Sequence, residues 1–440
     1  MTDSVQAQNA ATFAAAFEGY GGPAFAIRLW DGSRWSSSTN ARPACTILLE
    51  NPSALASLVV EPNEIGLGEA FIHGDLDVEG DIFSVFSIAE HLLNRPRALQ
   101  QRIAEKLAGG LFDMGQRLKH GSVSSRSRDR ASIAYHYDQP VAFFKPWLGR
   151  SLVYSCAYFH DAEDSLDSAQ EQKLEHVCRK LRLRPGERFL DIGCGWGSLP
   201  MYAACERQAR AEGITLSREQ AETAKRRIVD ARLDDCCSVH LLDYRELGGR
   251  GEQFDKISSI GMFEHVGLKN LALYFGIARQ LLRPGGLFLN HGIARARLSP
   301  IRQSSFIDRY VFPDGRLVTL AQALSAAESQ GLEVRDVENL REHYELTLRR
   351  WVAGLTRNVD TLLNHVSKTT YRTWLLSMAG SAAAFRRGDI GVYQVLLSRP
   401  DGGNSRLPLT REDLYSADLL QRGTLGVTIP DHESVDRRPR

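Results

Sequence analysis

The chain has 440 residues, enough for two or three domains and a large buried core. Its 43% hydrophobic and 24% charged residues are typical of a soluble globular protein, and a formal net charge of +1 gives no overall field for binding nucleic acid. The seven cysteines form no CxxC pair, and there is no signal peptide and no apolar run of about 18 residues. We therefore expect a cytoplasmic protein that does not span a membrane, and we assign no metal site.

The N-terminal part of the chain mixes strand-like and helical segments. We expect residues 1–20 to be a frayed start and residues 21–120 to be a first domain, with the strand-like runs FAIRLW and ACTILLE. In the passage 65–81, IGLGEAFIHGDLDVEGD, the glycines and aspartates suggest turns.

Residues 101–120 place apolar side chains at helical spacing, with basic side chains among and beside them. A basic amphipathic helix of this kind can lie on an anionic membrane surface. The alternative, which Gly109 and Gly110 favour, is an ordinary surface helix with its apolar side on the core. The next segment, GSVSSRSRDR at 121–130, is typical of a linker between domains.

Residues 131–400 alternate between strand and helix patterns, which predicts a parallel sheet covered by helices on both faces. One of these helices is expected to begin after Ser217. The tail 401–440 is polar, with a short helix expected in LPLTREDLY, capped by Thr410, and disorder elsewhere. The expected strands of the sheet include ERFLDIG, AEGITL, SVHLLD, FDKISSIG and LFLNHGI.

A glycine-rich turn follows the first of these strands. In FLDIGCGWGS, Asp191 ends the strand, and Gly193, Gly195 and Gly197 allow a tight turn and a close approach of a ligand. A GxGxG pattern alone is weak, because dinucleotide-binding folds share it. Thr215 lies 24 residues after Asp191, where the end of the second strand meets ribose hydroxyls in doubly wound folds.

The residues after the second and third strands extend this nucleotide site. Thr215 and Gln220 can hydrogen-bond a ribose without adding charge, and a turn shorter than GxGxxG fits a ligand that has no pyrophosphate. Asp243 and Tyr244 follow the third strand, where an adenine amine would be recognised. The alternative is that Asp243 only caps a turn. Together the series predicts that the chain binds S-adenosylmethionine.

Eight motifs in order resemble the cyclopropane-fatty-acyl-phospholipid synthase family over residues 60–400. The resemblance implies a class I S-adenosylmethionine methyltransferase of the α/β class, with a doubly wound seven-stranded sheet whose last strand, YQVLLSR at 393–399, is antiparallel. It also implies a smaller N-terminal domain of lipid-binding type, and an unsaturated acyl chain of a membrane phospholipid as substrate. The motifs are YSCAYF, LDIGCGWGS, GITLSREQ, LDYREL, GMFEHVG, NHGIA, RYVFPDG and HYELTLRRW.

The family contacts to the methionine end of the cofactor fall on Tyr154 and Ser155 of YSCAY. The complete set of expected cofactor-binding residues is Tyr154, Ser155, Asp191, Gly193, Gly195, Trp196, Gly197, Thr215, Leu216, Gln220, Asp243 and Tyr244.

The implied reaction methylates an alkene, which is a poor nucleophile, and so requires close placement and exclusion of water. Methyl transfer leaves a carbocation on the acyl chain, and ring closure then requires a base that removes a proton from the transferred methyl. Aromatic faces can stabilise such a cation. The alternative for each single ring is ordinary core packing. The candidates are Tyr137, Tyr158, Phe263 and Tyr310, with Phe159 and Phe312 beside the motifs.

The resemblance implies that the base is a bound bicarbonate held by five groups, two of them through the backbone of Cys156 and Ile293. Glu264 would share a proton with this anion, since two negative charges otherwise repel. His291 and Tyr344 would donate hydrogen bonds to it. Taken alone, Glu264 could sit at a helix start and His291 in the core. The five expected catalytic positions are Cys156, Glu264, His291, Ile293 and Tyr344.

One motif departs from the family pattern. The segment HYDQPVAFF at 136–144 has Pro140, which disfavours a helical conformation at Gln139 and removes a backbone donor. Because the resemblance places this segment in a lid over the substrate, the product is a cyclopropane ring or, alternatively, a methyl- or methylene-branched chain.

The leading domain favours a phospholipid-borne chain over a carrier-bound mycolate, and it disfavours a small-molecule methyltransferase. A remoter alternative is a non-catalytic protein that binds lipid and cofactor. We also expect peripheral association with the inner face of the membrane and, from relatives, a homodimer.

Overall fold

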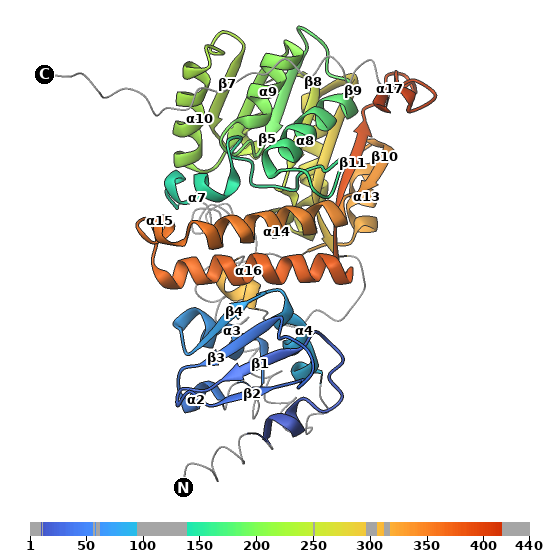
Figure 1. Ribbon diagram of the computed structural model, residues 1–440. Coiled ribbons are helices and arrows are strands. Elements are labelled where there is room, and N and C mark those ends of the chain that lie inside the picture. Colours follow the sequence, from blue (N-terminus) through green and yellow to red (C-terminus); the bar gives the residue numbers. More distant parts are fainter. Residues whose placement is uncertain are drawn as a thin grey trace, which may run out of the picture. The chain divides into compact units, whose positions relative to one another are not determined.

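A computed structural model describes residues 12–55, 62–94, 139–249, 251–295, 306–311 and 317–415, besides Ala10 and Leu58. The chain divides into two compact units (Figure 1). Unit 1 comprises Met1–Trp147, Ala296–Gly315 and Tyr344–Ile390, and unit 2 comprises Leu148–Arg295, Arg316–His343 and Gly391–Arg440. The amphipathic segment 101–120, the linker, Tyr137 and Phe312 lie outside the described residues.

Unit 2 contains a seven-stranded sheet in the order β10-β11-β9-β8-β5-β6-β7. The pairs β5–β6, β6–β7, β5–β8 and β8–β9 are parallel, whereas β11 is antiparallel to β10. These findings confirm the expected doubly wound α/β fold. The strands are β5 (Arg188–Ile192), β6 (Arg210–Thr215), β7 (Cys237–Leu241), β8 (Phe254–Ile260), β9 (Leu282–Arg295), β10 (Glu333–Asn339) and β11 (Ile390–Ser398).

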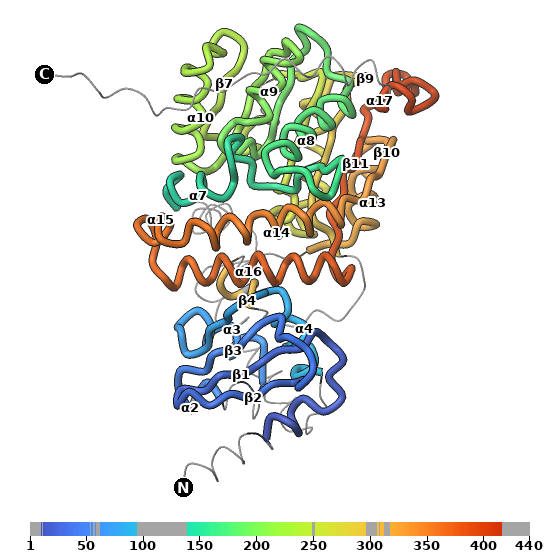
Figure 2. The backbone as a smooth tube through the Cα atoms, in the orientation of Figure 1, coloured from blue at the N-terminus to red at the C-terminus, as the bar shows by residue number. Residues whose placement is uncertain are grey.

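Helices cover both faces of this sheet because neighbouring strand residues point to opposite sides. Phe189 of β5 belongs to one apolar cluster, with residues of α8, α9 and α10, and Leu190 belongs to another, with residues of α11 and α13. The chain from green to yellow in Figure 2 follows this alternation of strands and helices. The helices are α8 (Leu166–Lys180), α9 (Ser198–Arg207), α10 (Arg218–Asp230), α11 (Leu271–Leu281) and α13 (Leu320–Ser329).

Unit 1 contains a four-stranded sheet in the order β2-β1-β3-β4, together with helices from distant parts of the chain. Its apolar core joins the rings of Phe13, Phe25 and Phe71 to the later residue Phe306. The elements are β1 (Phe25–Arg28), β2 (Arg34–Ser36), β3 (Cys45–Leu49), α2 (Pro52–Leu55), α3 (Glu64–His73), β4 (Leu76–Gly80), α4 (Ser84–Leu93), α7 (Val141–Leu148), α12 (Phe306–Tyr310), α14 (Arg341–Arg357, from Tyr344), α15 (Val359–Leu363) and α16 (Lys368–Arg387).

The passage 65–81, expected to form turns, is instead helix α3 followed by strand β4, and the turn prediction was wrong there. Gly68 lies inside the helix. A glycine is needed at this position because a Cβ would come within 2.3 Å of the Phe306 ring. The glycine thus permits close packing. The chain turns at Gly74, which has a positive φ of 90° and forms the C-terminal cap of α3.

The boundary between the units differs from the sequence-based division, which placed all of 131–400 in one catalytic domain. Residues 344–390 belong to unit 1, where α16 forms hydrogen bonds and an ion pair with the N-terminal segments. Arg372 of α16 is buried, and its guanidinium donates to the carbonyls of Phe71 and Leu76 and pairs with Asp77 at 2.9 Å.

The tail contains the expected short helix, α17, over Glu412–Tyr415. Leu414 is buried, and Arg182 forms a bidentate pair with Asp413 at 2.6 and 3.0 Å. Among the described residues, no helix is both long enough and apolar enough to cross a membrane.

Candidate active site

The glycine-rich turn leaves β5 at the edge of the sheet where the cofactor site was expected. Asp191 is buried there, and its Oδ1 accepts a 2.6 Å hydrogen bond from the Ser258 hydroxyl. Burial raises the pKa of Asp191 to about 6. Gly195 has φ +56°, and a Cβ there would meet no described atom within 4 Å, so the backbone is open to close approach of a ligand.

The two flanking glycines have a different role. Gly193, with φ +83°, lies against Met262, whose Cβ would be 3.2 Å from a Cβ at this position. Gly197, with φ +81°, lies similarly against Ala224 of α10. A side chain at either position would therefore push the turn away from its neighbours. The contact with Met262 also brings the cofactor turn next to the segment that carries Glu264.

The residues expected to bind the ribose lie together at the end of β6 and the start of α10. The Thr215 hydroxyl donates to Oε1 of Gln220 at 2.7 Å, and it accepts the Ser217 N–H. Ser217 caps α10 by accepting the Gln220 N–H, as its position before the helix predicted. Thr215 and Gln220 are both buried, with Leu216 partly exposed between them.

Asp243 at the end of β7 is engaged by its own neighbour. Its carboxylate accepts the backbone N–H of Arg245 and pairs with the Arg245 guanidinium at 2.6 Å. This geometry matches the alternative in which Asp243 caps a turn, here the 3₁₀ helix Tyr244–Gly249. The Tyr244 ring packs edge-on against Tyr274 at 5.6 Å. Recognition of adenine by Asp243 and Tyr244 stays a prediction.

The segment expected to meet the methionine end of the cofactor is fastened by α8. Gln170 donates to the carbonyl of Ser155 at 3.0 Å, and Lys173 donates to the Ser155 hydroxyl at 3.2 Å. Tyr154 is partly exposed beside them. Trp196, on the glycine-rich turn, is buried, and its carbonyl accepts from Arg227 at 2.6 Å.

The expected base site forms where the segment after β8 meets β9. Glu264 lies in the 3₁₀ helix Phe263–His265, and its Oε1 accepts the backbone N–H of Ile293 at 2.7 Å. Gly292 makes this approach possible, because a Cβ there would come within 2.1 Å of the Phe263 ring and 3.4 Å of the Glu264 carboxyl. The NHGIA glycine is therefore required by the close packing of these two segments.

Glu264 is only partly supplied with hydrogen-bond donors. Its Oε2 is buried and has no hydrogen-bond partner among the described residues. Burial raises the pKa of Glu264 to about 7, against the opposing effect of the Ile293 N–H. Near neutral pH the carboxyl group can therefore hold a proton or release one. Burial also lowers the pKa of the adjacent His265 to about 4.

His291 is buried on the face of β9 that Ile293 shares, two residues away. Its Nδ1 lies 3.2 Å from Nε2 of Gln394 on β11. Because an amide nitrogen can only donate, Nδ1 is the acceptor, and the proton of the neutral ring lies on Nε2. That Nε2 is buried without a hydrogen-bond partner in the described part of the chain. Burial and nearby lysines lower the pKa of His291 to about 3, so the ring is neutral.

The other two members of the expected base site have different settings. Cys156 is fully buried, and its thiol contacts the carbonyls of Ala157 and Leu340. Tyr344 belongs to unit 1, where its ring packs on Trp351 and on Phe385 of α16.

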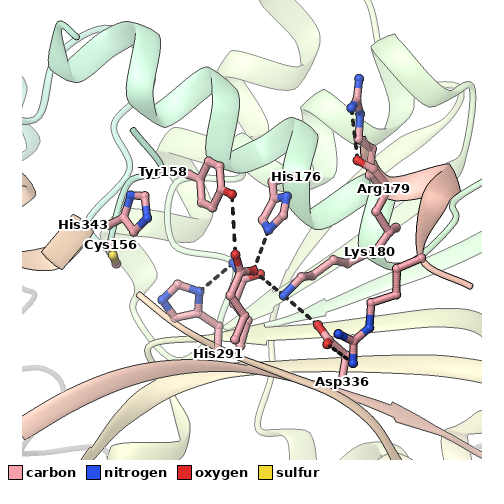
Figure 3. Close-up of polar contacts among 12 residues, drawn as sticks. Cys156, Tyr158, His176, Arg179, Lys180, His291, Asp336 and His343 are labelled. Atoms are coloured by element: carbon pink, nitrogen blue, oxygen red, sulfur yellow. Dashed lines mark hydrogen bonds and ion pairs between the residues drawn. The ribbon is translucent and has the colours of Figure 1, made fainter. Parts of the chain in front are cut away.

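Tyr158, a candidate for facing a substrate cation, has its ring stacked between two imidazoles (Figure 3). The ring of His176 lies 4.1 Å away and that of His343 lies 4.7 Å away. Its hydroxyl donates to Glu338 at 3.5 Å. Facing a carbocation would require this stack to open, so the geometry gives Tyr158 a packing role.

The remaining aromatic candidates that are described also pack inside the protein. Phe263 is buried in the apolar cluster that includes α11. Tyr310 belongs to unit 1, where it stacks on Phe306 and its hydroxyl donates to Glu69 at 2.6 Å. Phe159 is buried, and its N–H donates to His343.

A buried ionic network, which the sequence analysis missed, lies beside His291 (Figure 3). Glu338 of β10 accepts from His176 at 2.7 Å and pairs with Lys180 at 2.5 Å. Lys180 is fully buried and also pairs with Asp336 at 3.2 Å, which Arg411 of the tail contacts at 2.9 Å. Despite the cost of burial, these partners lower the pKa of Glu338 to about 2.

The missed residues share a single helix face. Charged and polar residues on a helix are most simply assigned to its solvated side. Their spacing of three to four residues along α8, parallel to an apolar stripe, is the signal that could have revealed a buried polar face. These residues are Gln170, Lys173, His176 and Lys180, all buried.

Comparison with known proteins decides the family. The mycolic acid cyclopropane synthetase family matches residues 124–395. The chain belongs to this family. A second match, to a domain of unknown function, covers residues 13–94.

Curated relatives span almost the whole chain. A probable fatty acid methyltransferase of Pseudomonas putida is 40% identical, over 88% of this chain and 95% of its own. The cyclopropane-fatty-acyl-phospholipid synthase of Escherichia coli is 33% identical, over 83% and 91% respectively. Among solved structures, the mycolic acid cyclopropane synthase CmaA1 complexed with SAH and CTAB has a TM-score of 0.57 and 32% identity, covering 61% of this chain and 97% of that one. The chain is therefore an S-adenosylmethionine-dependent methyltransferase of a lipid-modifying family.

Proposed function

We propose that this protein transfers a methyl group from S-adenosylmethionine to the double bond of an unsaturated acyl chain in a membrane phospholipid, and that the product is a cyclopropane. The observation that carries the proposal is the pair formed by Glu264 and His291 next to the cofactor turn, in which Glu264 Oε2 and His291 Nε2 are buried atoms without a hydrogen-bond partner in the described residues. A reaction that removes a proton after methyl transfer, as ring closure does, needs a proton acceptor oriented at that place.

The residues of the pair fit a small anion such as bicarbonate. Oε2 of Glu264 and Nε2 of His291 are both buried atoms with no hydrogen-bond partner in the described residues. Glu264, with its pKa raised to about 7, can share a proton with an anion, and neutral His291 can donate one hydrogen bond. The Ile293 N–H serves Glu264 itself. When bound, bicarbonate would supply the base that accepts the proton from the methylated chain.

This chain's own residues would then do three things. The glycine-rich turn and Thr215 place the cofactor, and the packing of Gly193 on Met262 fixes the distance from that turn to the base site. Glu264 and His291 orient the base. His291 and the Oε2 atom of Glu264 are buried, which keeps water, a competing nucleophile for the carbocation, away from them.

A second product is favoured by the names of two relatives. The Pseudomonas putida relative is a probable fatty acid methyltransferase, and UfaA1 of Mycobacterium tuberculosis, 31% identical over 84% of this chain, is a tuberculostearic acid methyltransferase. In this alternative the same cation loses a proton from a neighbouring chain carbon and gives a methyl-branched alkene. A methylene branch forms instead if a hydride shifts along the chain before a proton is lost from the transferred methyl. The pair Glu264 and His291 beside the cofactor turn supports a product that forms by loss of a proton from the transferred methyl, as the ring does.

The test uses the purified protein, S-adenosylmethionine labelled in its methyl group, and bicarbonate. Vesicles of phospholipid with unsaturated chains are compared with vesicles of saturated phospholipid and with free unsaturated fatty acid. We expect label in the unsaturated phospholipid alone. Label in free fatty acid alone would replace the substrate class, and no label in any lipid would overturn the proposal in favour of a non-catalytic lipid-binding protein.

The same proposal includes peripheral association with the inner face of the membrane and a homodimer. Sedimentation with anionic phospholipid vesicles and light scattering during size-exclusion chromatography would test these two points. Recovery of the protein only in the supernatant, or a monomer mass, would remove the corresponding part.

A further inference from the structure

A short segment of the tail, Arg411–Tyr415, is fastened to two other elements of unit 2, and we call it the strap. Just after α8, Arg182 holds Asp413 of the strap through a bidentate pair at 2.6 and 3.0 Å. On β10, which is an edge strand of the sheet, Asp336 pairs with Arg411 at 2.9 Å. The strap contains α17 (Figure 1) and lies beyond residue 395, where the family match ends. It therefore joins the end of α8 to the edge of the sheet by contacts outside the part that the family shares.

The strap supplies a positive charge to the buried ionic network. Lys180 is fully buried and is shared between two carboxylates, at 3.2 Å from Asp336 and 2.5 Å from Glu338. These carboxylates are only 11% and 24% exposed, so a single lysine would leave one negative charge poorly compensated. Arg411, whose side chain is 61% exposed, reaches Asp336 from the surface and provides a second cation. The third contact of the network, from His176 to Glu338, adds charge only when the imidazole is protonated.

The network is connected to His291 through neighbouring strands. Glu338 on β10 is the register partner of Gln394 on β11, so the two side chains project from the same face of the sheet. The amide nitrogen of Gln394 lies 3.2 Å from Nδ1 of His291 on β9, and its Oε1 is buried without a hydrogen-bond partner among the described residues. Lys180 and Glu338 also lie within electrostatic reach of the His291 ring. The amide thus has two possible acceptors beside it, the imidazole and the carboxylate of Glu338.

We propose that Arg411 of the strap is a positioning residue for His291. By pairing with Asp336, Arg411 leaves Lys180 on the carboxylate of Glu338. A carboxylate that is supplied in this way does not compete for the neighbouring amide, so the amide stays on Nδ1 and the imidazole keeps its proton on Nε2. The link to catalysis rests on the role of His291 in the proposed function, whereas the effect of Arg411 on the ring does not.

Four variants of the full-length protein separate the charge of Arg411 from the mere presence of the strap. Arg411→Gln leaves the carboxylate of Asp336 to compete with Glu338 for Lys180. The double variant Arg411→Gln with Asp336→Asn removes both charges and restores the balance, although the strap has lost its ion pair. Arg411→Lys keeps the cation. Glu412→Gln is the matched control, because it removes an exposed charge from the same short helix.

The first measurement is the ¹⁵N NMR spectrum of protein labelled in its histidine rings, without lipid or cofactor. The variant His291→Gln identifies the two ring signals of His291. In wild type and in Glu412→Gln we expect these signals to lie far apart, as in a neutral ring whose proton is fixed on Nε2. In Arg411→Gln we expect them to move towards each other, because the ring then samples both tautomers.

The second measurement is the rate of methyl transfer to unsaturated phospholipid vesicles. For Arg411→Gln we expect a decrease of about fivefold. Its affinity for S-adenosylhomocysteine should not change, since the residues expected to bind the cofactor lie on other elements. Arg411→Lys and the double variant should both return to within about twofold of the wild-type rate, because each restores the charge balance. Glu412→Gln should have the wild-type rate.

Wild-type ring signals in Arg411→Gln would overturn the proposal. An equal loss of rate in Arg411→Gln and in the double variant would do the same, because it would show that the strap acts only by holding α8. Altered ring signals with an unchanged rate would remove the positioning role as well. If the wild-type protein does not methylate phospholipid, the proposed function fails, and the NMR comparison still decides whether Arg411 controls the His291 ring.

Discussion

Two partly buried glutamates in unit 2 have opposite electrostatic settings. Glu338 accepts from Tyr158 and His176 and pairs with Lys180, and its pKa falls to about 2. Glu264 accepts one backbone N–H at one oxygen, and its pKa rises to about 7. The same residue type is thus held charged at one place and close to neutral at the other.

The difference separates a structural role for Glu338 from the catalytic role that we propose for Glu264. A carboxylate that is fully supplied with donors has no capacity left for a ligand, and it stabilises the fold through its partners. A buried carboxyl group with an unpaired oxygen costs stability, and such a cost is retained where the group is needed for function. Three of the five predictions below alter one of these two glutamates, and the other two alter residues of the expected base site or its support.

The largest expected effect is on catalysis at Glu264. Glu264→Gln keeps the acceptor for the Ile293 N–H but cannot exchange a proton, so we expect methyl transfer to fall by about 10²- to 10⁴-fold. Binding of S-adenosylhomocysteine should be unchanged. The rate is measured with labelled cofactor and unsaturated phospholipid vesicles, with the exposed Glu222→Gln as the control. Wild-type turnover in Glu264→Gln would remove this residue from the base site.

The next effect is on stability at Glu338. Glu338→Gln removes the main partner of the fully buried Lys180, so we expect a loss of about 3 kcal/mol in the free energy of unfolding. Since the folded-state pKa is lowered from 4.5 to about 2, the contribution of Glu338 is present above pH 4.5 and is lost as the pH falls towards 2. Urea unfolding at several pH values measures the free energy of unfolding. Glu333→Gln, at a more exposed position on the same strand, is the control. Equal stability of the two variants would contradict a structural role for the network.

Glu264→Gln should also show the cost of the catalytic carboxyl. Its folded-state pKa is raised from 4.5 to about 7, so the wild-type protein loses stability as the pH rises through that window. The variant has no such loss, and we expect it to be more stable than wild type by about 3 kcal/mol near pH 8, with no difference near pH 4. Thermal unfolding across this range checks the sign. A variant that is less stable than wild type at the higher pH would show that the carboxylate is satisfied when charged.

A smaller effect on methyl transfer is expected from Gln394, whose amide supports His291. Gln394→Leu removes the amide that lies against Nδ1 and leaves the ring free to change tautomer, so methyl transfer should decrease by about tenfold. Affinity for the cofactor should not change. Gln394→Glu replaces the donor by an acceptor, which favours a proton on Nδ1. It therefore fixes the opposite tautomer of His291 and should not rescue the rate. Rates equal to wild type in both variants would make His291 a packing residue.

The smallest effect is expected at Cys156. Because its backbone, and not its thiol, is assigned to the base site, Cys156→Ala should alter methyl transfer by less than about threefold. The buried thiol should also resist alkylation by iodoacetamide in the folded protein. A large loss of activity in this variant would assign a direct role to the sulfur.

The sequence predicted those features whose signal is local. The strand before Asp191, the cap at Ser217 and the adjacent Thr215 and Gln220 all follow from short patterns, and the structure has them in place. The alternation of strands and helices predicted the sheet for the same reason.

The remaining features depend on segments far apart in the chain. The passage around Gly68 was assigned to turns because the sequence does not show why a glycine is needed there. The need comes from the Phe306 ring, which lies more than 200 residues further along the chain. Tyr158 was expected to present an aromatic face, but His176 and His343 cover it. The polar face of α8, which includes Lys173, was assigned to solvent because the segments that pack on it come from elsewhere in the chain, and only its regular spacing indicated burial.

The most direct test of the base site is the fate of the methyl hydrogens. The protein is supplied with S-adenosylmethionine carrying a trideuterated methyl group, unsaturated phospholipid vesicles and bicarbonate, and the acyl chains are analysed by mass spectrometry and proton NMR. We predict a cyclopropane that retains two of the three deuterium atoms, since the site removes one from the transferred methyl, and a rate that decreases when bicarbonate is removed. A product that keeps all three deuterium atoms as a methyl branch would contradict deprotonation of that methyl at Glu264 and His291.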